Sequence, residues 1–313
     1  MNLVQNYRIL SRTPVLFVLL AVFWGTSFVA IEVGLHYFPP LLFAAIRYDV
    51  AGLLVLAYAV ARFDSWRPRT RGEVAGILVA GLLVFGAHHS LLYLGQQYVS
   101  GSIASVLISL SPVLTAGFAG LLLSGESLDA KGIVGLLTGL TGVVIVLDSD
   151  PAQFFGADTL GIGLVFLSAV SFALGSVLTR PFESDLPIQA TQGWAMVLGA
   201  VLLHLGSYVR GESASAILWT PSAVASFVYL TLISGVLAFS IYFVLLERIG
   251  PAELNLVGYL EPVTATLVGL VVLGQPIAVT TVTGFVTIFA GFTLVKRDRL
   301  VDLVDRRVGT SWH

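Results

Sequence analysis

The sequence contains no cysteine among its 313 residues, and only 11% of those residues are charged. Without cysteine there is no disulfide framework and no thiol-ligated metal. A soluble domain carries charge on about 25% of its residues, whereas here 57% are hydrophobic and the mean hydropathy is +0.93. A net charge of -2 provides no basic surface for nucleic acid. The composition therefore predicts a polytopic protein of the lipid bilayer.

Several enzyme motifs are also missing. No Gly-x-x-x-x-Gly-Lys-Ser/Thr loop is present, so ATP does not drive this protein directly. His-Glu-x-x-His, Gly-x-Ser-x-Gly and a pair of aspartates at mid-span are absent as well, and Ser234-Gly235 lacks a glycine two residues before the serine. These absences argue against an intramembrane enzyme. We expect no catalytic residues, no metal and no cofactor.

Long apolar segments fill most of the chain. A helix needs about 20 mostly apolar residues to cross about 30 Å of hydrocarbon. The predicted fold class is an all-α membrane protein with ten transmembrane helices at 14–34, 40–61, 73–95, 99–123, 131–148, 160–179, 187–208, 221–246, 251–273 and 277–296.

One motif occurs twice, about half a chain apart. Ser111-Pro112 and Glu261-Pro262 each place a polar residue before a proline in an apolar run, and a glycine follows about 13 residues later. Each half then contains five spans, an odd number, so the second half is predicted to be inverted relative to the first. The predicted units are two five-helix repeats and a cytoplasmic tail, at 14–148, 160–296 and 297–313.

Basic residues are distributed unevenly between the loops. With the N-terminus inside, only Arg210 lies in an outside loop, and Arg47 lies within a span. The positive-inside rule therefore predicts a plasma-membrane protein with both termini in the cytoplasm. The remaining 14 of the 16 lysines and arginines fall on the cytoplasmic side: Arg8, Arg12, Arg62, Arg67, Arg69, Arg71, Lys131, Arg180, Arg248, Lys296, Arg297, Arg299, Arg306 and Arg307.

A set of short motifs, in a fixed order, resembles a known family. The motifs are Phe23-Trp24-Gly25-Thr26-Ser27, Pro39-Pro40, Ile46-Arg47-Tyr48, Ser111-Pro112, Gly125-Glu126, Gly175-Ser176-Val177, Leu260-Glu261-Pro262-Val263 and Gly291. On these residues the chain, over roughly 14–296, resembles the drug/metabolite transporter superfamily, specifically its ten-helix proteins with two EamA domains.

The resemblance implies a secondary transporter that exports or exchanges small metabolites, such as amino acids and related compounds, by alternating access. The alternatives are an intramembrane enzyme and a passive channel for small solutes. The two halves differ in their side chains. Leu174 stands where Trp24 would repeat in the second half, and Ala195 falls near where Arg47 would repeat. Gln275-Pro276 also replaces the expected Gly-Glu. A symmetric mechanism with two equal sites is therefore not expected.

Arg47 is the first candidate for substrate binding. A charge within a span costs at least about 2.5–3.5 kcal/mol at the helix centre, so it needs a partner or a cavity. A guanidinium can clamp a carboxylate or phosphate with two hydrogen bonds. The alternative is a structural ion pair with Glu32, or an outward-reaching side chain. Asp49 points to the opposite side of the helix and is not expected to pair with Arg47.

Glu261 is the candidate for energy coupling, about ten residues into its predicted span. A buried carboxyl can exchange a proton near neutral pH; the alternative is a neutral group hydrogen-bonded to a neighbouring helix. Asn255 and Tyr259 share a face of the same helix at i and i+4. Ser109 lies on the equivalent helix of the first half. All three are candidate substrate contacts, with helix packing as the alternative.

Three aromatic residues within predicted spans complete the candidate substrate site. Trp24, Tyr93 and Tyr242 either line a cavity or pack in the core. His88 and His89 are adjacent, point in different directions, and cannot form a metal site by themselves.

Two helices carry stripes of small residues at helical spacing, which predicts close packing. A homodimer through such a face is left open. The stripes are Gly132, Gly135, Gly139 and Gly142 on one helix, and Thr280, Gly284, Thr287 and Gly291 on the other.

The loop charges make the topology testable by cysteine labelling, because the chain has no native cysteine. We expect Ser65→Cys to react only from the cytoplasmic side and Ser149→Cys only from outside. Membrane-impermeant maleimide applied to intact and to permeabilised cells measures this. Labelling of both positions from the same side would contradict the inverted arrangement.

Overall fold

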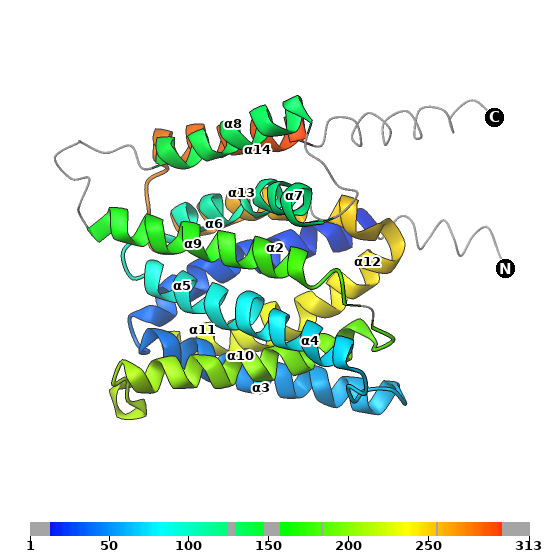
Figure 1. Ribbon diagram of the computed structural model, residues 1–313. Helices are drawn as coiled ribbons and strands as arrows, with labels where there is room; N and C mark the ends of the chain where they lie inside the picture. The colour runs from blue at the N-terminus through cyan, green and yellow to red at the C-terminus, as the bar shows by residue number, and fades with distance from the viewer. Residues whose placement is uncertain (1–12, 124–128, 147–156, 183, 255, 296–313) are drawn as a thin grey trace.

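The computed structural model describes residues 13–123, 129–146, 157–182, 184–254 and 256–295. These residues form helices and connecting turns without any strand, and the long helices lie roughly side by side (Figure 1). The predicted tail at 297–313 and the candidate Asn255 lie outside this part of the chain.

The described residues of the first half form eight helical elements. They are α2 (Thr13–Leu35), α3 (Pro40–Arg62), α4 (Arg71–Val79), the π-helix η1 (Ala80–Ala87), α5 (His88–Gly95), α6 (Gly101–Ile108), α7 (Ser111–Leu122) and α8 (Ala130–Val146). The elements α4, η1 and α5 form one continuous helical rod. The predicted span 99–123 is divided into α6 and α7 by a tightened turn at Ser109 and Leu110, ahead of Pro112. Proline lacks the N–H that an unbroken helix would use there.

The second half repeats much of this order. Its elements are α9 (Ala157–Leu178), α10 (Ile188–Val209), the 3₁₀ turn η3 (Ala214–Ala216), α11 (Pro221–Val228), the π-helix η4 (Tyr229–Leu237), α12 (Ala238–Leu254), α13 (Val257–Leu273) and α14 (Val279–Val295). The predicted boundary between 246 and 251 agrees with a break at Gly250, whose φ of 77° and ψ of 171° are not helical, so α12 consists of two helical segments. Glycine tolerates this left-handed conformation.

Within the described residues, seven helices are long and apolar enough to cross a membrane. Two of these are the continuous rods Arg71–Gly95 and Pro221–Leu246. Three shorter apolar helices, α8, α13 and α14, have 17 residues each. The all-helical membrane architecture is confirmed at this level, whereas the ten-span inverted repeat stays a prediction.

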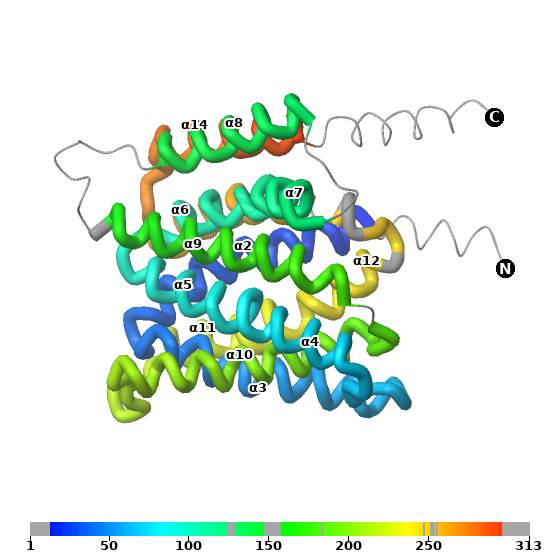
Figure 2. Tube along the Cα trace, in the orientation of Figure 1, coloured from blue at the N-terminus to red at the C-terminus, as the bar shows by residue number. Residues whose placement is uncertain are grey.

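The closest helix packing occurs between the two halves. In Figures 1 and 2, α8 and α14 lie together at one edge of the bundle and α3 and α10 at the opposite edge. Between these pairs, α2 packs against α12 and α13, while α9 packs against α5, α6 and α7. The core is therefore shared by both halves.

The two π-helices occupy matching places in the two halves. The His88 N–H bonds to the Leu83 carbonyl, and the Ala238 N–H bonds to the Ile233 carbonyl, both i→i−5. A glycine lies inside each, where a Cβ would stand 3.0 Å from the carbonyl oxygen five residues earlier, at Gly86 and at Gly235. These glycines leave room for the wider backbone turn of a π-helix.

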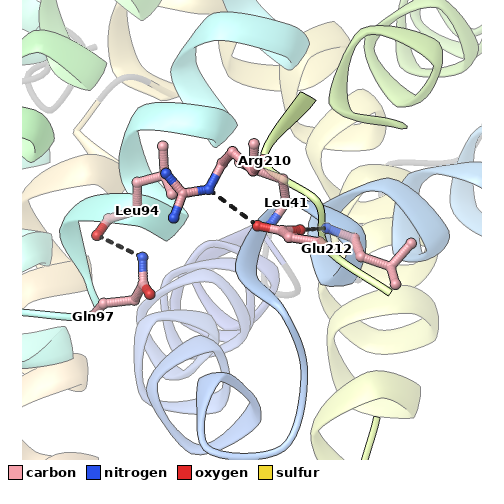
Figure 3. A network of polar contacts seen from close by, with 6 residues as sticks. Leu41, Leu94, Gln97, Arg210 and Glu212 are labelled. Atoms are coloured by element: carbon pink, nitrogen blue, oxygen red, sulfur yellow. Dashed lines mark hydrogen bonds and ion pairs between the residues drawn. The ribbon is translucent and has the colours of Figure 1, made fainter. Parts of the chain in front are cut away.

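The start of α3 is capped from a distant loop. The Glu212 carboxylate accepts from the Leu42 N–H at 2.8 Å and the Leu41 N–H at 3.3 Å, and Arg210 donates to it at 3.3 Å (Figure 3). Helix N-termini leave N–H groups unsatisfied, and a carboxylate there is favourable. Gly211, with φ of 72°, allows the sharp turn between the two charged residues.

The predicted glycine stripes on α8 and α14 face each other. A Cβ on Gly142 would lie 2.7 Å from the Gly284 carbonyl oxygen, and one on Gly135 would lie 2.6 Å from the Gly291 carbonyl oxygen. The packing role is thus confirmed within one chain. On α14, Ile288 completes the buried face, while Thr287 is only half-buried and bonds its own helix.

We expect Gly291→Ala to destabilise the protein by about 1–3 kcal/mol, the usual cost of overpacking. The added Cβ would stand 2.5 Å from the Gly135 carbonyl oxygen and 2.6 Å from the Gly139 nitrogen, and backbone atoms cannot move aside. Gly163→Ala is the matched control, because its Cβ would meet nothing within 4 Å. Thermal unfolding in detergent, followed by size exclusion, measures both. Equal unfolding temperatures would refute the close approach of α8 and α14.

Candidate functional site

Arg47 lies inside the helix bundle with only 5% of its surface exposed. Its Nη1 donates to the Tyr93 hydroxyl at 2.6 Å, and its Nη2 donates to the Tyr48 hydroxyl at 3.2 Å. The guanidinium also lies 4.6 Å from the centre of the Tyr48 ring, a cation–π contact. Its Nε has no hydrogen-bond partner among the residues that the structure describes. Two of the predicted site residues, Arg47 and Tyr93, are therefore in direct contact.

The hydrogen bonds continue from Arg47 into α5. His89 Nδ1 lies 3.2 Å from the Val84 and Phe85 carbonyl oxygens, which can only accept, so Nδ1 carries the proton. The Nε2 of the neutral ring is then an acceptor, and the Tyr48 hydroxyl donates to it. Arg47, Tyr48 and His89 thus form one directed chain of donors that ends on the backbone.

His88 faces α9 instead, as adjacent residues on a helix must point in different directions. Its Nδ1 contacts the Ser168 carbonyl oxygen at 3.1 Å and the Ser168 hydroxyl at 2.7 Å. The Ser168 hydroxyl in turn donates to the His88 carbonyl at 2.8 Å. This exchange joins α5 to α9.

No carboxylate neutralises Arg47 in the described part of the chain. Glu32, the alternative partner, instead accepts from the Gly101 N–H at 2.7 Å and from the Gln275 side-chain amide. The predicted ion pair between Arg47 and Glu32 is therefore wrong, because the Glu32 carboxylate is bonded to the start of α6 and to the turn after α13. Asp49 bonds His204 of α10 at 2.7 Å, on the outer side of α3, and is separate from Arg47 as expected.

Trp24 and Tyr242, two further predicted site residues, also meet. Their ring centroids are 5.5 Å apart, and Phe239 lies 5.3 Å from Trp24. The Trp24 indole donates to the Ser234 carbonyl at 3.3 Å, and the Tyr229 hydroxyl donates to the Phe23 carbonyl at 3.1 Å. The group joins α2 to η4 and α12.

Two other predicted site residues, Tyr259 and Ser109, lie apart from Arg47 and Trp24. Tyr259 packs on Phe292 and Phe289 of α14, with ring centroids 4.5 and 5.3 Å away. Its buried hydroxyl has no hydrogen-bond partner among the described residues. Ser109 donates to the Val106 carbonyl of its own helix at 2.6 Å. Neither residue contacts Arg47 or Trp24 through a described interaction.

Glu261 lies in the second turn of α13, where that helix packs on α2. A Cβ on Gly25 would stand 2.7 Å from the Glu261 carbonyl oxygen, so the two backbones touch. The side chain is half-buried and makes no hydrogen bond or ion pair with the described residues, so the hydrogen-bonded alternative is not found. Because α13 begins at Val257, Glu261 lies about 6 Å along it, rather than the about 15 Å that ten residues would give.

A small pocket lies beside the contact between Glu32 and Gln275. It has a volume of about 190 Å³, and its polar lining comes from Ser100, Ser102, Thr266, Gln275 and Thr281. The sequence interpretation did not include these residues in the site. The one signal in the sequence was Gln275, which departs from the family pattern.

These helices, with polar side chains held between apolar spans, define a multi-pass membrane protein. The chain belongs to the EamA-like transporter family, which matches residues 12–148 and 159–297. The resemblance to the drug/metabolite transporter superfamily is confirmed by this match. Membership of a transporter family, rather than an enzyme family, agrees with the absence of catalytic motifs.

Individual relatives are also named as transporters. The uncharacterized transporter YvbV of Bacillus subtilis is 29% identical over 91% of this chain and 92% of its own length. The uncharacterized inner membrane transporter YedA of Escherichia coli K12 is 27% identical over 80% of this chain and 79% of its own length. A solved crystal structure with 22% identity has a TM-score of 0.61 and covers 90% of this chain and 96% of that one, which shows a shared fold.

The hydrogen bonds of Arg47 predict a stability difference between two tyrosines of α3. Tyr48→Phe removes an acceptor from the buried guanidinium and a donor from His89, so we expect a loss of about 1–3 kcal/mol. Tyr58→Phe is the control, because Tyr58 is 52% exposed on the same helix. Thermal unfolding of both variants in detergent tests this, and equal stability would contradict the directed chain.

Proposed function

We propose that this protein is a secondary transporter that exports or exchanges small metabolites bearing a carboxylate, such as amino acids and related compounds. Alternating access between two inverted five-helix repeats carries them across the plasma membrane. The observation that carries the proposal is the buried Arg47 guanidinium, whose described partners are all neutral.

A lone cation in the membrane interior favours an anionic ligand. Its burial costs at least about 2.5–3.5 kcal/mol, and phenol hydroxyls supply hydrogen bonds without an opposite charge. A substrate carboxylate would supply that charge and pair with the guanidinium in a bidentate geometry. The Nε of Arg47 and the hydroxyl proton of Tyr93 remain as donors for it, because neither has an acceptor among the described residues.

The ten-span inverted arrangement is part of the proposal. It is supported by the matching π-helices and by the packing of equivalent helices across the halves, α3 with α10 and α8 with α14. The three shorter helices of 17 residues are each about 26 Å long, close to the thickness of a hydrocarbon core. The loop charges support cytoplasmic termini.

Trp24 and Tyr242 serve as an aromatic wall of the substrate path in this proposal. Their ring contact joins α2 of the first half to α12 of the second. In alternating access one repeat moves against the other, so α2 and α12 would shift relative to each other at this contact. Flat aromatic side chains suit this role because they cover a substrate with few rotatable bonds.

Counterflow in proteoliposomes tests the function. Overexpressing cells are first screened for resistance to amino acids and their analogues, and the resulting compounds are then used as labelled probes. We propose that transport is trans-stimulated, independent of ATP and without chemical change of the solute. Flux linear in concentration without trans-stimulation would indicate a channel, and a modified product would indicate an enzyme.

Arg47→Lys should weaken the uptake of carboxylate probes in this counterflow assay by at least about tenfold. Lysine keeps the charge but lacks the planar fork that holds a carboxylate by two bonds. Arg62→Lys is the control, since Arg62 is exposed at the end of the same helix. An unchanged half-saturation concentration in Arg47→Lys would remove Arg47 from the substrate site.

Glu261→Gln should abolish concentrative transport driven by a pH gradient and leave counterflow largely intact. Glutamine preserves size and hydrogen bonding but cannot release a proton, whereas exchange does not require that release. Asp64→Asn, in an exposed loop, is the control. Accumulation by Glu261→Gln against a pH gradient at the wild-type level would assign this residue to helix packing alone.

A further inference from the structure

A groove of about 300 Å³ lies where α4 begins, outside the proposed substrate site. Arg69, Thr70 and Arg71 line one end of it, and Val74, Ala75 and Leu78 line the other. One end is thus cationic and the other apolar, an amphipathic pattern.

The two arginines at the polar end have no counter-ion in the described part of the chain. Both side chains are exposed. The nearest carboxylate along the chain is Glu73, which is only 7% exposed and accepts from the Arg69 N–H at 2.7 Å and the Thr70 N–H at 2.9 Å. Glu73 therefore completes the capping box of α4 and leaves the guanidinium charges of Arg69 and Arg71 to an outside partner.

The apolar end continues along the helix as a stripe. Val74, Leu78 and Leu82 recur every four residues and are 43%, 52% and 52% exposed. The distance from Arg71 to Leu82 is about 16 Å along the axis, and one leaflet of the hydrocarbon core is about 15 Å thick. The stripe thus matches the length of one acyl chain in one leaflet.

The loop before α4 is joined to α10 by aromatic residues. Trp66 and Trp194 stack with centroids 6.1 Å apart and an angle of 7° between their planes. The Trp194 indole donates to the Trp66 carbonyl at 3.0 Å, and the Arg67 guanidinium lies 4.5 Å from the Trp66 ring centre. Tryptophan prefers the level of the lipid headgroups, so we expect Arg69 and Arg71 to lie at the depth of lipid phosphates.

We propose that this groove binds an anionic phospholipid. Its phosphate contacts Arg69 and Arg71, and one acyl chain follows Val74, Leu78 and Leu82. The apolar stripe gives a lipid contacts that a free phosphate ion lacks. A zwitterionic lipid binds more weakly, because its own cation is repelled by the two guanidinium groups.

Native mass spectrometry of the full chain in detergent, titrated with dioleoyl phosphatidylglycerol or dioleoyl phosphatidylcholine, tests the site. We expect the first lipid to bind at least about tenfold more tightly than the second. Arg69→Ala with Arg71→Ala should remove this preference. The control is Arg62→Ala with Lys131→Ala, which removes two exposed charges that do not line the groove, and it should retain the preference.

Two further measurements distinguish a lipid seated in the groove from a phosphate ion held by charge alone, with folding checked by size exclusion. Ala75→Trp fills the groove without changing the charge and should weaken phosphatidylglycerol binding, whereas inorganic phosphate should not displace the lipid. Equal binding of the two lipids, an equal loss in the control variant, or displacement by phosphate would overturn the proposal.

Discussion

Close contact between helix backbones at glycine positions is the constraint on which this structure depends. Lipid tails are as apolar as leucine, so the hydrophobic effect does not drive helices together within a membrane. Association instead needs dense packing, which small residues permit. Between α8 and α14 the backbones meet at Gly135, Gly142, Gly284 and Gly291. Between this pair and the pair α3 and α10, Gly25 lets α13 approach α2, which brings Glu261 beside the helix that carries Trp24.

The closely packed helices enclose a network of polar side chains. Arg47, Tyr48 and His89 satisfy most of one another's hydrogen-bonding groups, and the chain ends on backbone carbonyls. Such a network is costly when it is only partly satisfied. The Nε of Arg47 and the hydroxyl proton of Tyr93 have no acceptor among the described residues, and the positive charge has no described counter-ion. In the proposed function, these donors are the groups that bind the substrate carboxylate.

The two halves share a backbone plan but differ in their side chains. The π-helices η1 and η4 match in position and each contains a glycine, at Gly86 and Gly235. Packing across the halves also pairs equivalent helices. By contrast, Trp24 and Arg47 occur only in the first half, and the corresponding Leu174 and Ala195 provide no polar group. A movement common to both halves would thus act on a site that is asymmetric.

The sequence alone determined the membrane class, the helical fold and the family, because hydrophobic run length and motif order are properties of the chain itself. It also identified Arg47, Tyr93, Trp24 and Tyr242 as separate candidates, and the structure brought them together in two pairs. Which side chains contact each other across different helices was decided only by the tertiary structure. From the sequence, Glu32 was a possible partner of Arg47, but in the structure its carboxylate accepts from the first N–H of α6 and from Gln275. The roles of Tyr48 and of the pair Asp49 and His204 depend on which helix packs on α3, and helix periodicity fixes a face but not the neighbour that covers it.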